Sequence, residues 1–172
     1  MRRVFTIAAA AGAVLALAAP AASAAASPSG SSGWHPSPTA PFVQTDSCTF
    51  PIRGEAVKDE EETRVDSTLP DGSPRIQEFR GPLVMRFTNT SNGRSVVRDV
   101  TGYGRLHFFT SGASNGYFDG GVSLHIPIGN RGYPAGFYVL HGRVRAMIAA
   151  DGTRTFGSLR HATIENLCRT LS

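Results

Sequence analysis

The stretch V-S-L-H-I-P-I, residues 122–128, alternates apolar side chains with other side chains. The stretch Y-V-L-H-G-R-V-R-A-M-I, residues 138–148, follows with the same period, because most alternate positions are apolar and His141, Arg143 and Arg145 lie between them. A period of two is the repeat of a β-strand that buries one face. Both stretches therefore predict strands rather than helices.

Two earlier runs, residues 83–88 and 105–108, show the same alternation. Sequences that tolerate positive φ separate the runs, and such sequences form turns between paired strands. These turn sequences are Pro70-Asp71-Gly72, Asn92-Gly93, Asn115-Gly116 and Asp151-Gly152. Short strands separated by glycine-rich turns are typical of antiparallel sandwiches and barrels. We predict an all-β fold, an antiparallel barrel or sandwich of about eight strands, whose tail at 165–171 either extends or closes as a short helix.

Residues 1–24 have the pattern of a secretory signal peptide. Arg2 and Arg3 precede an apolar run at 4–19, and the small residues at 22–24 offer a cleavage site. The run is too short for a membrane span, so we expect a secreted, extracellular protein with no stable membrane anchor after cleavage. The arginine pair leaves the twin-arginine export route open beside the general one.

Residues 25–46 are rich in serine, proline and alanine and are predicted to form a disordered linker. Trp34 lies in this stretch, where we expect it to be exposed or loosely docked. Residues 47–172 then form a single β domain, a size that supports one core.

The charge balance argues against nucleic-acid binding. The chain has 17 basic and 13 acidic residues, and loss of Arg2 and Arg3 with the signal leaves 15 basic residues against the 13 acidic ones. No basic run accompanies this small excess, so the electrostatic footprint of a nucleic-acid-binding protein is missing.

Cys48 and Cys168 are the only cysteines, and an exported chain meets oxidising conditions. They are predicted to form a disulfide, which would stabilise the fold by about 4–5 kcal/mol in the chain-entropy model for a loop of this size. A redox or metal-binding thiol pair is the alternative, but its C-x-x-C spacing is missing.

One sequence matches a catalytic pattern. Residues 112–116 fit G-x-S-x-G, in which Ser114 would be the nucleophile. That motif works on a turn from a strand into a helix, whereas residues 117–128 predict a strand. A flexible hairpin loop is the preferred interpretation.

Three histidines are candidates for a metal site. His107, His125 and His141 all lie on the polar faces of predicted strands, and adjacent strands could bring them together. The strand register that would decide this is not readable from the sequence, so ordinary hydrogen-bonded histidines remain the preferred alternative. No motif predicts a bound cofactor.

Carboxylates are scattered along the chain. The run at 59–62 predicts a solvated loop, and a pair for glycoside hydrolysis could come from Asp99, Asp119 and Glu78. Residues 89–91 form a glycosylation sequon at the edge of a turn.

Several turns resemble those of a group of small secreted proteins from actinomycete bacteria. The similar features are Cys48 at the domain start, L-x-D-G at 69–72, a T-N-x-x-x-G-x-S segment at 88–95, and the closing residues 166–171. The group closes with an aspartate before its cysteine, whereas Asn166-Leu167 stand there in this chain. The resemblance covers most of 47–172 and implies export and a disulfide frame, without an activity or a site.

These features favour a secreted, non-catalytic module that binds an unknown small apolar ligand or an extracellular surface. Phe87, Phe108, Phe137 and Tyr138 would line a ligand cavity or pack the core. A secreted hydrolase acting on polysaccharide or ester is the first alternative. A secreted inhibitor presenting the loop 111–116 is the second. The sequence leaves the oligomeric state open.

Overall fold

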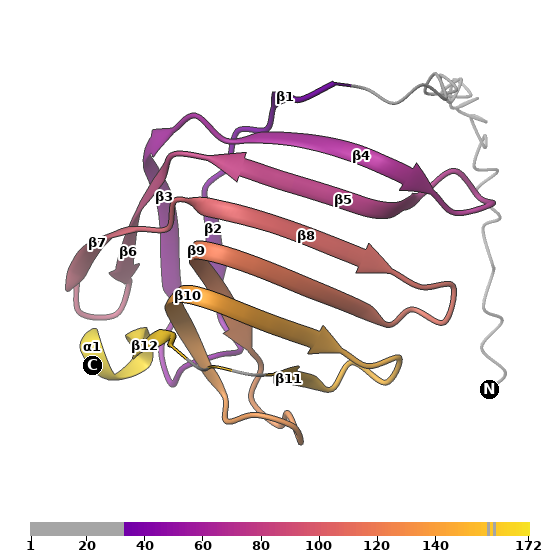
Figure 1. Ribbon diagram of the computed structural model, residues 1–172. Coiled ribbons are helices and arrows are strands. Elements are labelled where there is room, and N and C mark those ends of the chain that lie inside the picture. The colour runs from indigo at the N-terminus through magenta and orange to yellow at the C-terminus, as the bar shows by residue number, and fades with distance from the viewer. Residues whose placement is uncertain (1–32, 158, 160) are drawn as a thin grey trace, which may run out of the picture.

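A computed structural model describes residues 33–172 except Ser158 and Arg160, so the predicted signal peptide lies outside the described residues. The chain forms two antiparallel sheets and one short helix (Figure 1). Sheet A has the order β1 (His35–Pro36), β4 (Glu62–Thr68), β5 (Pro74–Gly81), β8 (Gly102–Phe108), β9 (Ser114–Ile126), β10 (Gly136–Ile148) and β11 (Arg154–Phe156), and β12 (Thr163–Asn166) also pairs with β10. Sheet B has the order β2 (Phe42–Gln44), β3 (Ile52–Asp59), β6 (Leu83–Asn89) and β7 (Ser95–Asp99), and α1 spans Leu167–Thr170.

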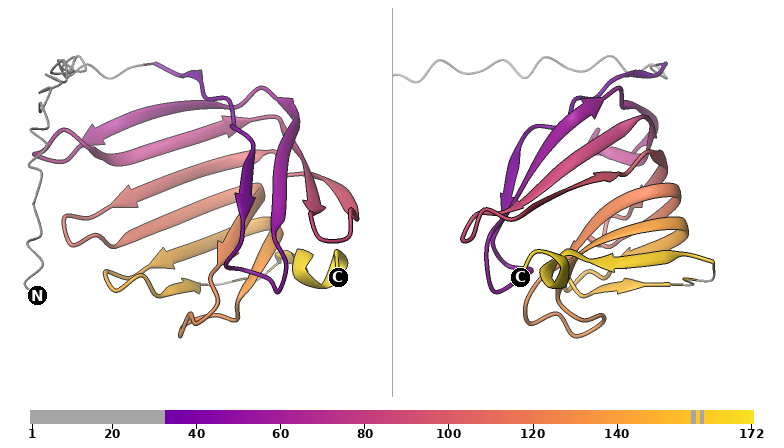
Figure 2. Two further views of the ribbon diagram at one scale, coloured as in Figure 1. Left: turned by 180° about the vertical axis from the view of Figure 1, so that it is seen from behind. Right: turned by 90° about the vertical axis from the view of Figure 1, so that its left-hand side faces the viewer.

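The all-β prediction is confirmed, and the described strands form two sheets rather than a closed barrel. Figure 2 shows the strands of sheet B running across those of sheet A, as in an orthogonal sandwich. The hairpin ends β4–β5, β8–β9 and β10–β11 extend past sheet B (Figure 1). The described residues form twelve strands instead of about eight, because several are only two to four residues long.

A line of four glycines crosses sheet A and bends it. Gly81 pairs with Gly102, Gly102 with Gly120, and Gly120 with Gly142. Three of them have φ between +104° and +123°, which favours glycine. A Cβ on Gly120 would lie 2.9 Å from the Cα of Gly102, so the backbones approach too closely for a side chain. At this line β9 and β10 turn sharply (Figure 1), and each strand has one arm before it and one after it.

The main core lies between sheet B and the first arm of β10. Met85 and Phe87 of β6 are buried with Phe137 and Val139 of β10. The opposite face of the same arm is also buried, because Tyr138 and its neighbours form a second cluster. The alternation around β10 predicted one buried face, but this arm is covered on both sides and is buried at every position from 136 to 140. The second cluster contains Ile126, Tyr138, Leu140 and Val144.

The predicted disulfide is confirmed. Cys48 and Cys168 are bonded with a Cα–Cα separation of 5.3 Å, and the tail takes the short-helix alternative as α1. Asn89 is only 2% exposed and its Nδ2 donates to the Leu171 carbonyl at 3.0 Å, while Asn92 Nδ2 donates to the same oxygen at 3.2 Å. The asparagine of the sequon is therefore buried, and its side-chain amide is hydrogen-bonded in the folded protein.

Part of the stretch predicted as a disordered linker is paired into the two sheets, and its residues 25–32 lie outside the described residues. Within 33–46, β1 pairs with β4 and β2 pairs with β3. Phe42 stacks on Phe137 with ring centroids 6.0 Å apart, and the Trp34 ring lies 4.1 Å from the Arg80 guanidinium carbon. Composition averages over a stretch and misses such single aromatic side chains, so the domain begins before the predicted residue 47.

Among the described residues no helix has the length and apolar character needed to cross a membrane.

Candidate functional site

The extended hairpin ends leave one face of sheet A without a covering sheet, and this face is hollowed. The hollow, called the apolar groove below, has a volume of about 370 Å³. The strand register places its side chains on one face, because Gly104 pairs with both Phe79 and Phe118, and Gly116 pairs with both Leu106 and Ala146. The main apolar lining residues are Phe79, Leu106, Phe108, Phe118, Ala146 and Ile148, and all six are only half-buried.

Two glycines form the floor of the apolar groove. The Phe118 ring lies against Gly104 and Gly116, since a Cβ on Gly116 would be 2.6 Å from Phe118 Cε2 and one on Gly104 would be 3.1 Å from Cδ1. A side chain at either position would displace the ring into the hollow. In the sequence, Gly104 and Gly116 each stand two residues before an apolar side chain of the groove. Only the pairing of β8 with β9 brings the two glycines together.

One carboxyl group lines the apolar groove. Glu61 belongs to the acidic run at 59–62, which was predicted to be a solvated loop. The connection between β3 and β4 is only residues 60 and 61, since Asp59 ends β3 and Glu62 begins β4, and Glu61 is half-buried rather than solvated. Burial, reinforced by the nearby charge of Asp59, raises the pKa of the Glu61 carboxyl. The groove is therefore apolar with an acidic group on its wall.

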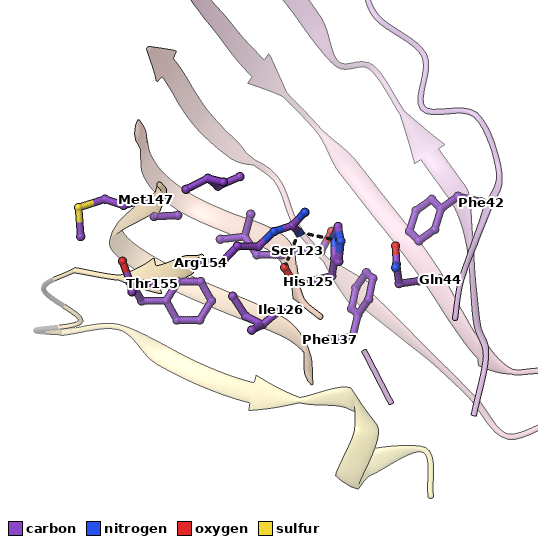
Figure 3. Close-up of a pocket in the computed structure, with 13 residues that line it drawn as sticks. Phe42, Gln44, Ser123, His125, Ile126, Phe137, Met147, Arg154 and Thr155 are labelled. Atoms are coloured by element: carbon purple, nitrogen blue, oxygen red, sulfur yellow. Dashed lines mark hydrogen bonds between the residues drawn. The ribbon is translucent and has the colours of Figure 1, made fainter. Parts of the chain in front are cut away.

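A second hollow adjoins the apolar groove. This arginine pocket, of about 320 Å³, contains Arg154 of β11 and His125 of β9 between aromatic side chains (Figure 3). Ser123, Leu124, Ala146 and Ile148 line both hollows. The aromatic walls of the arginine pocket are Phe42, Phe137 and Phe156.

Arg154 binds the histidine beside it. Its Nη1 lies 2.7 Å from His125 Nε2 and donates to the His125 carbonyl oxygen at 2.9 Å. Burial and then the charge of Arg154 lower the pKa of His125, against an opposite effect of Asp46. Because a guanidinium can only donate, His125 Nε2 is the acceptor in this contact. Asn130 fixes the backbone of Arg154, accepting from its N–H at 2.7 Å and donating to its carbonyl at 2.9 Å.

The charge of Arg154 has no carboxylate partner in the part of the chain that the structure describes. The ion pairs there involve other arginines and one lysine. Its Nε is buried and has no hydrogen-bond partner. A guanidinium is always charged, and a partly buried charge is costly when it is not paired. The pocket is therefore suited to an anionic group.

The three candidate metal ligands do not converge. His141 pairs with Gly121 of β9, four residues from His125, which is about 13 Å along the strand. His107 pairs with Asn115, farther along β9, and stacks on Phe109. Zinc ligands must all lie near 2 Å from one ion, so this register separates the triad. Within 33–172, apart from the two undescribed positions, no three metal-ligating side chains cluster.

The four candidate catalytic residues all lie in β-strands, and each of the three carboxylates among them has a polar partner. Ser114 begins a strand, β9, and not the helix that a nucleophile elbow requires. Glu78 accepts from the Tyr103 hydroxyl at 2.6 Å, which with the neighbouring arginines lowers the pKa of Glu78, and Thr101 lowers that of Asp99. A general acid needs a raised pKa. Asp119 is 3.5 Å from Arg143.

The predicted cavity aromatics divide between core and hollows. Phe87 and Tyr138 are packed in the two cores, Phe108 lines the apolar groove, and Phe137 lies between the main core and the arginine pocket. Of the predicted loop at 111–116, residues 111–113 lie in the turn between β8 and β9, and Gly112 and Ala113 border a further hollow to which Phe108 also contributes. Residues 114–116 belong to β9, so the predicted turn at Asn115-Gly116 is wrong.

Comparison of this chain with protein-family models, with curated proteins and with solved structures finds no match, so the function is argued from the site itself.

Proposed function

We propose that this protein is a non-catalytic binding module that holds a small amphiphile with its apolar part in the apolar groove. The observation that carries this proposal is a hollow of about 370 Å³ on an uncovered sheet face, with phenylalanine and leucine side chains left half-buried. Sites for small molecules are concave and mostly apolar with a few polar groups, and a contiguous apolar patch on a folded domain marks a binding surface.

The shape of the groove supports a small ligand over a polymer. Its floor is formed by β8 and β9, where Phe118 covers the two glycines, so it is closed from below. Polysaccharide binding would need polar side chains along the path, whereas the lining is dominated by apolar surface. The amphiphile binds by desolvation of its apolar part.

Export belongs to the same proposal. The residues at 1–24 predict a signal peptide, and the Cys48–Cys168 disulfide is compatible with an oxidising extracellular environment. An amphiphile-binding module outside the cell would meet ligands that are poorly soluble in water.

The proposal is tested with N-phenyl-1-naphthylamine, a neutral apolar dye that fluoresces when it leaves water. We expect saturable binding to the secreted protein. Leu106→Lys places a charge on the groove wall and weakens binding by about tenfold or more, because the ligand would desolvate the charge. The control is Val97→Lys, at a valine that is 47% exposed on β7 of sheet B, and we expect unchanged binding.

Circular dichroism and the melting temperature of both variants establish that they are folded. A wild-type protein that does not bind the dye, or equal dye affinity in the Leu106→Lys and Val97→Lys variants, contradicts the proposal.

A further inference from the structure

We propose that the amphiphile is a fatty acid whose carboxylate binds Arg154 in the arginine pocket while its acyl chain lies along the apolar groove. This inference rests on the proposed function and names the ligand class and the residue that selects it. The apolar groove alone does not define a head group, whereas the arginine pocket beside it does.

The two hollows are connected in the way that such a ligand needs. Ser123 and Leu124 of β9, and Ala146 and Ile148 of β10, line both. A molecule that fills one hollow can therefore continue into the other past these side chains. The connection is apolar apart from the Ser123 hydroxyl, which suits the first carbons of an acyl chain.

Charge complementarity assigns the head group. Arg154 is a cation that the described acids do not pair, and its Nε is buried without a hydrogen bond. Nη1 is held by His125, and Nη2 makes no hydrogen bond to the described residues. Asp46 is exposed, accepts from Gln44, and is outside ion-pair distance of Arg154. Arginine and carboxylate form strong charge-assisted hydrogen bonds.

The acidic group on the groove sets the direction of the ligand. Glu61 lines the apolar groove and does not line the arginine pocket. A fatty-acid carboxylate placed at Glu61 would meet like charge, whereas at Arg154 it meets opposite charge. The acyl chain accordingly runs from Arg154 over Ala146 toward Phe118 and Phe108.

The experiment compares three amphiphiles that have alkyl chains of nearly equal length and differ in the charge of the head group: dodecanoate, dodecanol and dodecyltrimethylammonium. Displacement of N-phenyl-1-naphthylamine from the wild-type protein at pH 7 gives the affinities. Dodecanoate should bind most tightly and the cation most weakly. In Arg154→Gln the affinity for dodecanoate should fall by about tenfold to a hundredfold, and that for dodecanol should be unchanged.

Two further variants complete the test. Arg131→Gln removes an arginine whose side chain is 82% exposed on the neighbouring loop, and it should leave all three affinities unchanged. Arg154→Lys keeps the positive charge and should retain most of the preference for dodecanoate. If Arg154→Gln does not fold, the order of affinities in the wild type and the behaviour of Arg154→Lys still decide the proposal.

The possible failures are distinguishable. If the neutral dye and dodecanol bind but dodecanoate has no advantage, or Arg154→Gln leaves its affinity unchanged, the fatty-acid assignment is overturned and the apolar binding site stands. If no ligand binds, the proposed function fails with it. A dimer in sedimentation velocity that Leu106→Lys dissociates and dodecanoate does not would assign the groove to a second copy of the chain and overturn the inference.

Discussion

Glu78 is a carboxylate that the fold buries with its partners. Its side chain is 2% exposed, yet it accepts from Tyr103 and from Arg105 Nη1 at 2.9 Å, and it also pairs with Arg64. It lies on the face of sheet A opposite the apolar groove, because it pairs with Arg105 rather than with the groove-lining positions. Hydrogen bonds and opposite charges of this kind favour the ionised form.

The stability of the domain should depend on pH through the carboxyl groups of Glu78 and Glu165. The Tyr103 hydrogen bond leads the causes that lower the pKa of Glu78, and the Arg98 hydrogen bond leads those that lower the pKa of Glu165, both from an ordinary value of 4.5. A lowered folded-state pKa gives stability that is present above the unfolded pKa and is lost as the pH falls through the folded one. In urea unfolding, the free energy of unfolding should therefore stay unchanged with pH near neutrality and decline below about pH 4.5.

Glu78→Gln should lower the free energy of unfolding at pH 7 by about 1–3 kcal/mol and make its decline with acid shallower. Glu60→Gln is the matched control, because Glu60 and its partner Lys58 are both well exposed and the pair contributes little. If the free energy of unfolding declines identically with acid in the wild type and in Glu78→Gln, this cluster does not control acid stability.

Of the residues that line the two hollows, some were predictable from the sequence and others were not. Phe108 could be predicted as a cavity-lining side chain because its strand alternates. Arg154 could not, since its strand is only three residues long and His125 lies 29 positions earlier. His125 pairs with Phe137 in the first arm of β10, whereas Arg154 pairs with Ile148 in its second arm. The two side chains therefore meet through the bend of the sheet, which is a tertiary property.

At the level of elements, the glycine line predicts where sheet A is least tolerant of change. Gly120 has φ +104°, and a Cβ there would lie 2.9 Å from both Gly102 Cα and Thr101 O. Gly72 has φ +86°, but a Cβ there would have no atom within 4 Å. The two positions share a positive φ, which strains any residue with a side chain, and they differ in crowding.

Gly72→Ala should lower the free energy of unfolding by about 1–2 kcal/mol from the left-handed conformation alone. Gly120→Ala should cost clearly more, because backbone of the neighbouring strand must also move. Urea unfolding measures both losses in free energy, provided that the two variants unfold with the same m-value. Equal losses in the two variants would mean that the sheet accommodates the extra methyl group without distortion.

The strands at 83–88, 105–108, 122–128 and 138–148 were predicted from their period of two, and β6, β8, β9 and β10 confirm them. The bend in β9 and β10 was not predictable, because Gly102, Gly120 and Gly142 become neighbours only through pairing. The bend explains how β10 changes from a two-sided buried arm to an arm with one face on the apolar groove.

For the whole molecule, the disulfide is the largest single constraint, since it joins residues 120 positions apart. The variant with Cys48→Ser and Cys168→Ser should lose about 2–5 kcal/mol of the free energy of unfolding. Denaturant titration of the variant against the oxidised wild type measures the loss. The same variant with unchanged stability would show that the noncovalent contacts of the C-terminal segment suffice.

The all-β class and the disulfide were predictable because periodicity and cysteine number are local properties of the sequence. The crossing of the two sheets and the docking of β1 and β2 were not, because they depend on contacts such as that of Phe42 with Phe137. The groove is the product of that crossing: sheet B covers only part of sheet A (Figure 2).

The anchoring of the C-terminal segment has a consequence for the order in which the domain is made. Leu167 and Leu171 are 0% and 1% exposed and belong to the main core, so a nascent chain that ends before them has an unfilled interior. Such distant contacts form slowly, and incompletely packed intermediates are prone to aggregate. The domain is thus expected to reach its native packing only after residues 167–171 have been released from the ribosome.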